Sequence, residues 1–155
     1  MAEEKDFEDR VRVVEFDNAQ GRKLTGEDLA AMQPGLARLM PDIGARVWKL
    51  YYAAQAKNWP LAKFQLKEAK KLMELGALTR PKYEENLGKF IEEQVKPMMA
   101  AIEAQDLEKF NQEFEKSVEQ ANAYHELYDK PFLRWKVPSQ PPPDLDLTPR
   151  PKLQK

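Results

Sequence analysis

The stretch Asn58-Trp59-Pro60-Leu61-Ala62-Lys63-Phe64-Gln65-Leu66-Lys67-Glu68-Ala69 decides the fold class of this chain. Asparagine caps free amide groups at a helix start, and proline is well tolerated at the first helical positions. Apolar residues then recur at spacings of three and four, which predicts an amphipathic helix ending at Gly76. We expect its apolar stripe to comprise Leu61, Phe64, Leu72 and Leu75, with Ala62, Leu66, Ala69 and Met73 alongside.

Three further segments on either side show the same helical spacing. They run from about Pro41 to Asn58, from about Pro81 to Ile102 with an interruption at Pro97, and from an Asp106 cap to the stop at Lys130-Pro131. Because short connections make neighbouring helices antiparallel, the sequence predicts an all-α protein, an antiparallel up-down four-helix bundle.

The two ends of the chain differ from the middle in composition. Residues 1–24 form a charged N-terminal arm in which Val11–Phe16 is an edge strand or extended segment, and Thr25 then caps a short first helix. Residues 25–130 hold the bundle. Residues 131–155 hold seven of the twelve prolines. Proline lacks an amide donor, so this tail is either disordered or an extended arm lying on something.

Bulk composition excludes several function classes. The net charge is −1, which argues against a nucleic-acid partner, and no run is long enough to span a bilayer. Zero cysteines exclude disulfides and thiolate metal sites, and we predict no metal site. The polar start, Met1–Asp6, favours a cytoplasmic protein, with a periplasmic location as the alternative if a leader was removed.

One short motif carries the functional signal. Ala121-Asn122-Ala123-Tyr124-His125 has the frame of the haem-attachment signature Cys-x-x-Cys-His, with Ala121 and Tyr124 in place of both cysteines. His125, the only histidine, lies four residues after Ala121 and therefore on the apolar face of the last helix. It is either a hydrogen-bonded core or helix-end residue, or a proximal ligand to non-covalent haem. Methionine is a possible second haem ligand, but core filling explains the methionines of this chain better.

The motif extends into a wider resemblance. Val47–Trp59 resembles the "LWYAAxAxNW" passage of a family of small helical c-type cytochromes, and Leu61–Glu68 resembles the next passage of that family. The similarity resumes at Ala121–His125, where that family has Cys-Asn-Ala-Cys-His, and continues through Tyr128–Leu133; it covers roughly residues 36–145. The resemblance implies a four-helix bundle with haem on the last helix and a role in electron transport. Without the cysteines, covalent attachment is impossible.

Two further groups of residues are candidates. Glu68 falls within an apolar stripe, so we expect it at the stripe's margin beside a lysine; the alternative is an acid–imidazole pair with His125, or half of a metal site. In the tail, we expect Phe132 to pack on the bundle and the chain beyond Pro138 to be free for another protein. The candidate partner-binding residues are Phe132, Trp135, Pro141, Pro142 and Pro143.

These observations predict a haem-free, cytochrome-derived structural or interaction protein. We expect an accessory subunit of a larger redox or photosynthetic assembly, with other protein subunits as partners, no cofactor and no enzymatic activity. Whether it also forms a homo-oligomer stays open. The alternative is a binder of non-covalent haem or metal that uses His125 in electron transfer or sensing.

Overall fold

The computed structural model describes residues 16, 17 and 19–151, so the expectation for Val11–Glu15 lies outside the described part of the chain. The chain divides into two compact units, residues 1–35 and 36–155, which we describe separately. We call the described part of the second unit, residues 36–151, the helical domain.

The first unit contains a small hairpin and a short helix. Strand β1 (Phe16–Asp17) pairs antiparallel with β2 (Lys23–Leu24). Helix α2 (Gly26–Met32) follows, and Thr25 caps it as predicted. The Thr25 hydroxyl accepts from the Asp28 amide at 3.1 Å, and the Asp28 carboxylate accepts from the Thr25 amide at 2.9 Å. This reciprocal capping box satisfies amide groups that a helix start leaves free.

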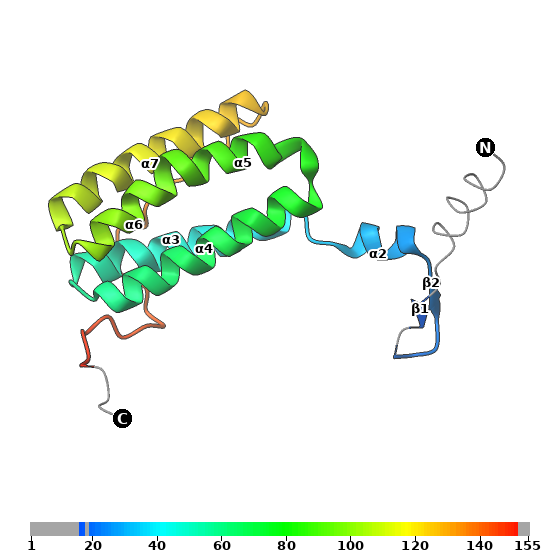
Figure 1. The fold of residues 1–155 in the computed structure, drawn as a ribbon, viewed down its shortest axis with the longest axis horizontal. Helices are drawn as coiled ribbons and strands as arrows, with labels where there is room; N and C mark the ends of the chain where they lie inside the picture. Colours follow the sequence, from blue (N-terminus) through cyan, green and yellow to red (C-terminus); the bar gives the residue numbers. More distant parts are fainter. Residues whose placement is uncertain (1–15, 18, 152–155) are drawn as a thin grey trace. The chain divides into compact units, whose positions relative to one another are not determined.

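The helical domain confirms the predicted all-α class. Figure 1 shows its long helices lying side by side, with the two short helices α5 and α6 in line as one rod. The elements are α3 (Leu36–Gln55), α4 (Trp59–Thr79), the single turn η1 (Pro81–Tyr83), α5 (Glu84–Phe90), the π-helical turn η2 (Ile91–Val95), α6 (Lys96–Glu103) and α7 (Leu107–Leu127). The predicted caps at Asn58 and Asp106 are both present, each accepting from an amide three residues later.

Three tight turns end α3, α6 and α7 in the same way. A residue with positive φ, namely Lys57, Gln105 or Asp129, follows the helix. Around each, two amides return to the last helical turn, for example Lys57 to the Ala54 oxygen at 2.9 Å and Asn58 to the Ala53 oxygen at 2.8 Å. This is the Schellman pattern, which normally uses glycine. After α3 and α6 the next residue already caps the following helix, so the chain reverses within three residues.

The apolar face of α4 differs from the predicted stripe. The buried residues are Trp59, Ala62, Gln65, Leu66, Ala69, Met73 and Gly76, whereas Phe64 is 51% exposed. Leu61, Leu72 and Leu75 are partly buried and pack at the border of this face, so among the predicted stripe residues only Phe64 lies outside it. The residues expected alongside the stripe form the centre of the buried face. The prediction that the helix ends at Gly76 was also wrong. A Cβ there would lie 2.6 Å from Leu36 Cδ2, so this glycine allows a close approach of α3.

Two prolines lie inside helical segments. Helix α3 begins at Leu36 rather than near Pro41, because Pro41 removes only a bond to the carbonyl of Ala37, an exposed residue in the first turn. At Pro97 the expected interruption takes the form of η2, in which the Lys96 amide bonds to the Ile91 oxygen five residues back. The wider π turn makes room for the proline ring where a regular helix would clash.

The positive-φ residues generate a stability prediction. A residue with a side chain in the left-handed region destabilises the folded state by roughly 1–2 kcal/mol. Glycine removes this strain, but it also loses more conformational entropy on folding, which offsets part of the gain. We therefore expect Lys57→Gly and Gln105→Gly each to stabilise the protein by about 0.5–1 kcal/mol. The control is Lys67→Gly, at an exposed position inside α4, which should destabilise by about 1 kcal/mol. Urea unfolding measures all three; the same loss of stability in all of them would contradict the prediction.

Candidate functional site

A cavity of about 190 Å³ lies within the helical domain, and every long helix contributes to its wall. The lining is predominantly aliphatic, aromatic and thioether, and none of the residues that form it in the described chain is Asp, Glu, Lys or Arg. Its members are Leu36, Met40, Ile43, Gly44, Val47, Leu50, Leu66, Met73, Tyr83, Asn86, Leu87, Phe90, Val95, Met98, Ser117, Val118, Ala121, Tyr124, His125, Tyr128 and Trp135.

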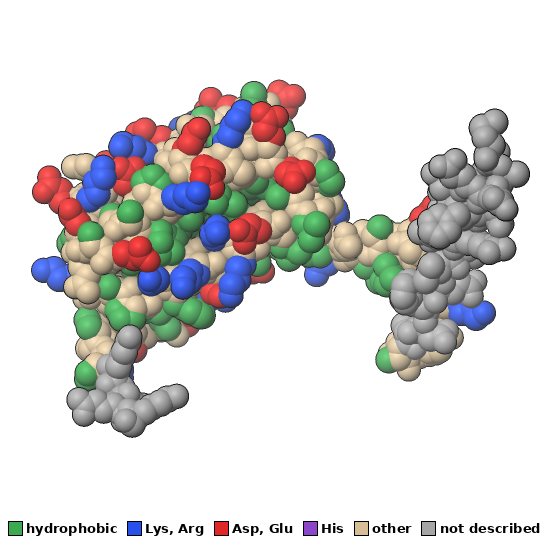
Figure 2. Space-filling view, in the orientation of Figure 1, with side chains coloured by type: hydrophobic (Ala, Val, Ile, Leu, Met, Phe, Trp, Pro, Cys, Tyr) green, Lys and Arg blue, Asp and Glu red, His purple; other side chains and the backbone are tan. Residues whose placement is uncertain are grey.

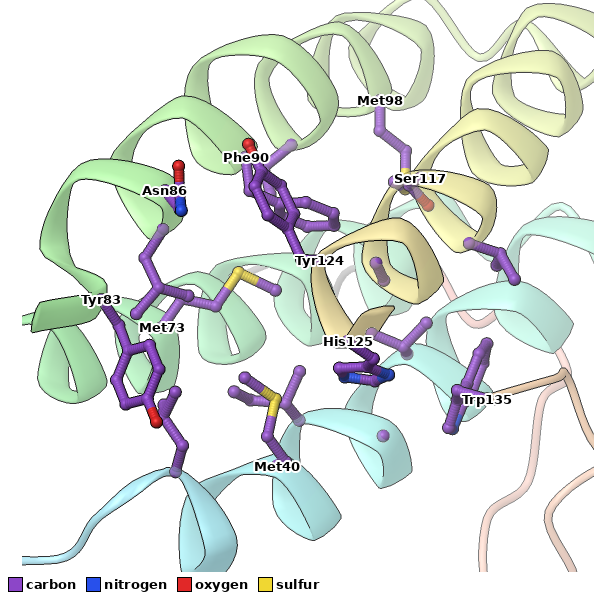
Figure 3. Close-up of a pocket in the computed structure, with 18 of the residues that line it drawn as sticks. Met40, Met73, Tyr83, Asn86, Phe90, Met98, Ser117, Tyr124, His125 and Trp135 are labelled. Carbon is purple, nitrogen blue, oxygen red and sulfur yellow. The ribbon is translucent and has the colours of Figure 1, made fainter. Parts of the chain in front are cut away.

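The three motif positions all face this cavity. Ala121, Tyr124 and His125 have spacings of three and four on α7, so they share one face of the helix. Figure 3 shows Tyr124 and His125 directed toward a space that Met40 and Trp135 approach from other segments. The Tyr124 ring lies edge-on to Phe90, with centroids 6.4 Å apart. The three positions that the sequence pattern singled out are therefore among the residues that line the cavity.

His125 is half-buried near the end of α7, and one of its nitrogens is already bonded. Its Nδ1 lies 2.6 Å from the Leu133 carbonyl oxygen. A carbonyl can only accept, so Nδ1 carries the proton and Nε2 of the neutral ring is an acceptor. This hydrogen bond fixes the tautomer and the ring orientation, as a carbonyl partner does for histidines in general.

A buried amide attaches the C-terminal tail to α7 beside His125. The Trp135 amide donates to Asn122 Oδ1 at 2.8 Å, and Asn122 Nδ2 donates to the Trp135 carbonyl at 3.0 Å. The Trp135 indole then packs on Gly44, where an added Cβ would lie 3.1 Å from Nε1. Trp135 thus forms one wall of the cavity, and Gly44 provides the space for its ring.

The rest of the tail continues along the helical domain, and we call residues 131–148 the C-terminal strap. Its carbonyl oxygens accept from side chains of the helices: Tyr52 Oη donates to Pro138 at 2.8 Å and Trp48 Nε1 to Gln140 at 2.9 Å. Asn58 Nδ2 donates to the carbonyl of Leu147 at 3.2 Å. The strap is therefore an extended arm on its own domain, one of the two predicted alternatives.

The candidate partner-binding residues separate into two groups. Phe132 is 76% exposed, which contradicts the expectation that it packs on the helices, because the turn after α7 directs it outward; Trp135 packs there instead. Pro142 is buried, while Pro141 and Pro143 are exposed. The expectation that the chain beyond Pro138 is free is wrong as far as the strap reaches, because its carbonyls are bonded to the helices.

Glu68 lies at the margin of α4 and bonds to a lysine, as expected. Lys71 Nζ donates to Glu68 Oε1 at 2.7 Å, and this hydrogen bond lowers the pKa of the Glu68 carboxyl. Glu68 is absent from the cavity lining, so the structure does not pair it with His125. Among the described residues no group of three or more His, Cys, Asp and Glu side chains could hold a metal ion.

The cavity does not fit a haem. An engineered cavity of about 150 Å³ is known to hold one benzene ring, so a cavity of about 190 Å³ accepts about one ring, whereas a porphyrin joins four. Tyr124 and Trp135 line this cavity together with His125.

Two important residues were missed from the sequence. Asn122 stands eight residues after Phe114 and four after Val118, so helical spacing places it on the apolar face of the last helix. Its burial could therefore have been predicted from the sequence. Asn86, whose Nδ2 donates to the Tyr128 hydroxyl at 2.7 Å, gave no such signal. Both bonds join parts of the chain that sequence spacing alone does not relate.

Asn122 generates the second prediction. Asn122→Asp keeps an acceptor for the Trp135 amide but loses the donor to its carbonyl, and should destabilise the protein by about 1–3 kcal/mol because that carbonyl is left facing a carboxylate. Gln112→Ala, at an exposed site on the same helix, is the control and should stay within about 0.5 kcal/mol. Chemical unfolding measures both, and equal effects would refute the role of Asn122.

The far end of the strap generates a prediction about pH. Lys49 Nζ donates to Asp144 Oδ2 at 2.6 Å, which lowers the pKa of Asp144 from its ordinary value of 3.8. A carboxyl whose pKa is lowered in the folded state stabilises the folded protein at pH values above its ordinary pKa. This contribution disappears as the pH falls through the lowered, folded-state pKa. We therefore expect wild type to be more stable than Asp144→Asn near neutral pH, with the difference vanishing well below pH 3.8. A difference that is independent of pH in denaturant titrations would contradict this.

No helix in the described ranges combines the length and apolarity that crossing a bilayer requires. Figure 2 shows charged side chains of both signs spread over the visible face of the helical domain, with apolar side chains gathered between them.

Comparisons of the chain with family models, curated proteins and solved structures found no match.

Proposed function

We propose that this protein is a haem-free module with the architecture of a helical cytochrome, working as an accessory subunit of a larger redox or photosynthetic assembly. In this proposal the helical domain is an antiparallel up-down four-helix bundle whose role is structural. The observation that carries it is the site around Ala121, Tyr124 and His125, which has room for one ring rather than four and no thiol to attach a porphyrin.

Support for a partner protein comes from the surface beside this site. Leu127, Phe132 and Leu133 expose 64%, 76% and 46% of their surface, and we call these three residues the apolar patch. Leu133 is held on both sides, because its amide donates to the Lys130 carbonyl at 2.9 Å and its own carbonyl meets His125. An ordered apolar anchor loses little entropy on binding, which favours association with another protein.

The haem-free state is tested directly by absorption. The protein isolated from its source should show no Soret band, and titration with haem should give no saturation at a one-to-one ratio, because the cavity cannot admit the macrocycle. A His125→Ala variant should behave identically. Stoichiometric haem in the isolated protein would overturn the proposal.

The subunit role is tested by the mass of the native complex. In the source cells, the wild-type chain should migrate in a species larger than itself, and the double variant Phe132→Ser, Leu133→Ser should lose that species. Leu78→Ser, at an exposed leucine on α4, is the matched control and should retain it. A monomeric wild type, or loss of the species in both variants, would contradict an interaction through the apolar patch.

A second candidate function uses His125 as a ligand to non-covalent haem or a metal in electron transfer or sensing. It is favoured by the Nδ1 hydrogen bond to Leu133, because metal-binding histidines commonly donate their other nitrogen to a carbonyl. This function requires Tyr124 and Trp135 to move aside. Saturable one-to-one binding in wild type, lost in His125→Ala, would establish it in place of the first.

A further inference from the structure

We propose that the cavity in the helical domain binds a small, uncharged, monocyclic aromatic compound carrying one hydroxyl group, with phenol as the simplest member of the class. Binding of this kind needs only the geometry of the cavity, so it is independent of the proposed subunit role. Four features of the wall lead to it: its size, its composition, the state of its polar groups and the acceptor atom Nε2 of His125.

Size selects a single ring. The volume of about 190 Å³ slightly exceeds that of an engineered apolar cavity of about 150 Å³ that binds benzene. A benzene ring with one small substituent fits this difference. A fused polycyclic compound or a pigment does not, unless the wall rearranges.

Composition selects an aromatic, uncharged ligand. Rings from four segments reach the wall, among them Tyr83, Phe90, Tyr124 and Trp135, so a planar guest meets edges and faces of neighbouring rings. Met40, Met73 and Met98 add thioethers, which make favourable contacts with aromatic rings. A carboxylate or ammonium group would be desolvated there with no opposite charge in the wall, so ions are excluded.

Several polar groups of the wall are already hydrogen-bonded within the protein. Asn86 donates to the Tyr128 hydroxyl at 2.7 Å, and the Ser117 hydroxyl donates to the Phe114 carbonyl at 2.7 Å. An apolar guest therefore leaves these groups satisfied. His125 provides an acceptor, because Nδ1 donates to the Leu133 carbonyl and Nε2 of the neutral ring is therefore unprotonated. A hydroxyl on the guest can donate to Nε2, which favours phenol over benzene.

The experiment is a calorimetric titration of the full chain with phenol, benzene and benzoate. We expect one saturable site for phenol, binding about tenfold weaker for benzene because one hydrogen bond is lost, and none for benzoate. Because the chain has a single histidine, its ring signals in a nitrogen NMR spectrum need no assignment. The chemical shift of Nε2 should change when phenol is added and remain unchanged when benzene is added. Absence of saturable binding by both phenol and benzene would overturn the proposal.

Two neighbouring alanines on α7 localise the site. Ala121→Leu places side-chain carbon into the cavity, so it should raise the midpoint of thermal unfolding and lower phenol affinity by at least about tenfold. Ala123→Leu, at an exposed position two residues away, should change neither. Should Ala121→Leu fail to fold, Val118→Ile adds one methyl group to the same wall and should weaken phenol binding. Undiminished binding in the folded wall variant would show that phenol binds elsewhere and refute the site.

Discussion

The amide of Asn122 is the interaction on which the region around the cavity depends. It is buried, and both of its polar atoms bond to the backbone of Trp135. An amide that pairs with a peptide unit in this way satisfies two donors and acceptors at once, and breaking it leaves buried polar groups without partners. The pairing fixes where the chain returns after α7, and it places the indole against Gly44 and the Leu133 carbonyl against His125.

The cavity follows from this arrangement. Trp135 forms one wall from the strap while Ala121, with its short side chain, leaves the opposite space open. Tyr124 lines this volume without filling it. Ala121 and Tyr124 therefore border an apolar space, and His125 lines it with its Nδ1 held by the Leu133 carbonyl.

Sequence reasoning succeeded where the structure is determined locally. The caps at Thr25, Asn58 and Asp106 depend on residues within one helical turn, and the spacing of α7 correctly grouped Ala121, Tyr124 and His125. It failed where long-range packing decides. In α4 the buried face is centred on Ala62, Leu66, Ala69 and Met73, while Phe64 is exposed, because the position of the neighbouring helices decides which part of the apolar surface is covered. The strap was undetermined for the same reason, since its partners lie about 90 residues earlier in the chain.

The composition of the strap has a consequence for how molecules of this protein meet one another. An extended segment on a protein surface usually presents free amides and carbonyls, and so acts as a template for strands from other molecules. Here several positions are proline and lack the amide, and carbonyls at Pro138, Gln140 and Leu147 are taken by helical side chains. The strap is thus a long arm that offers few free backbone groups for strand addition by other molecules.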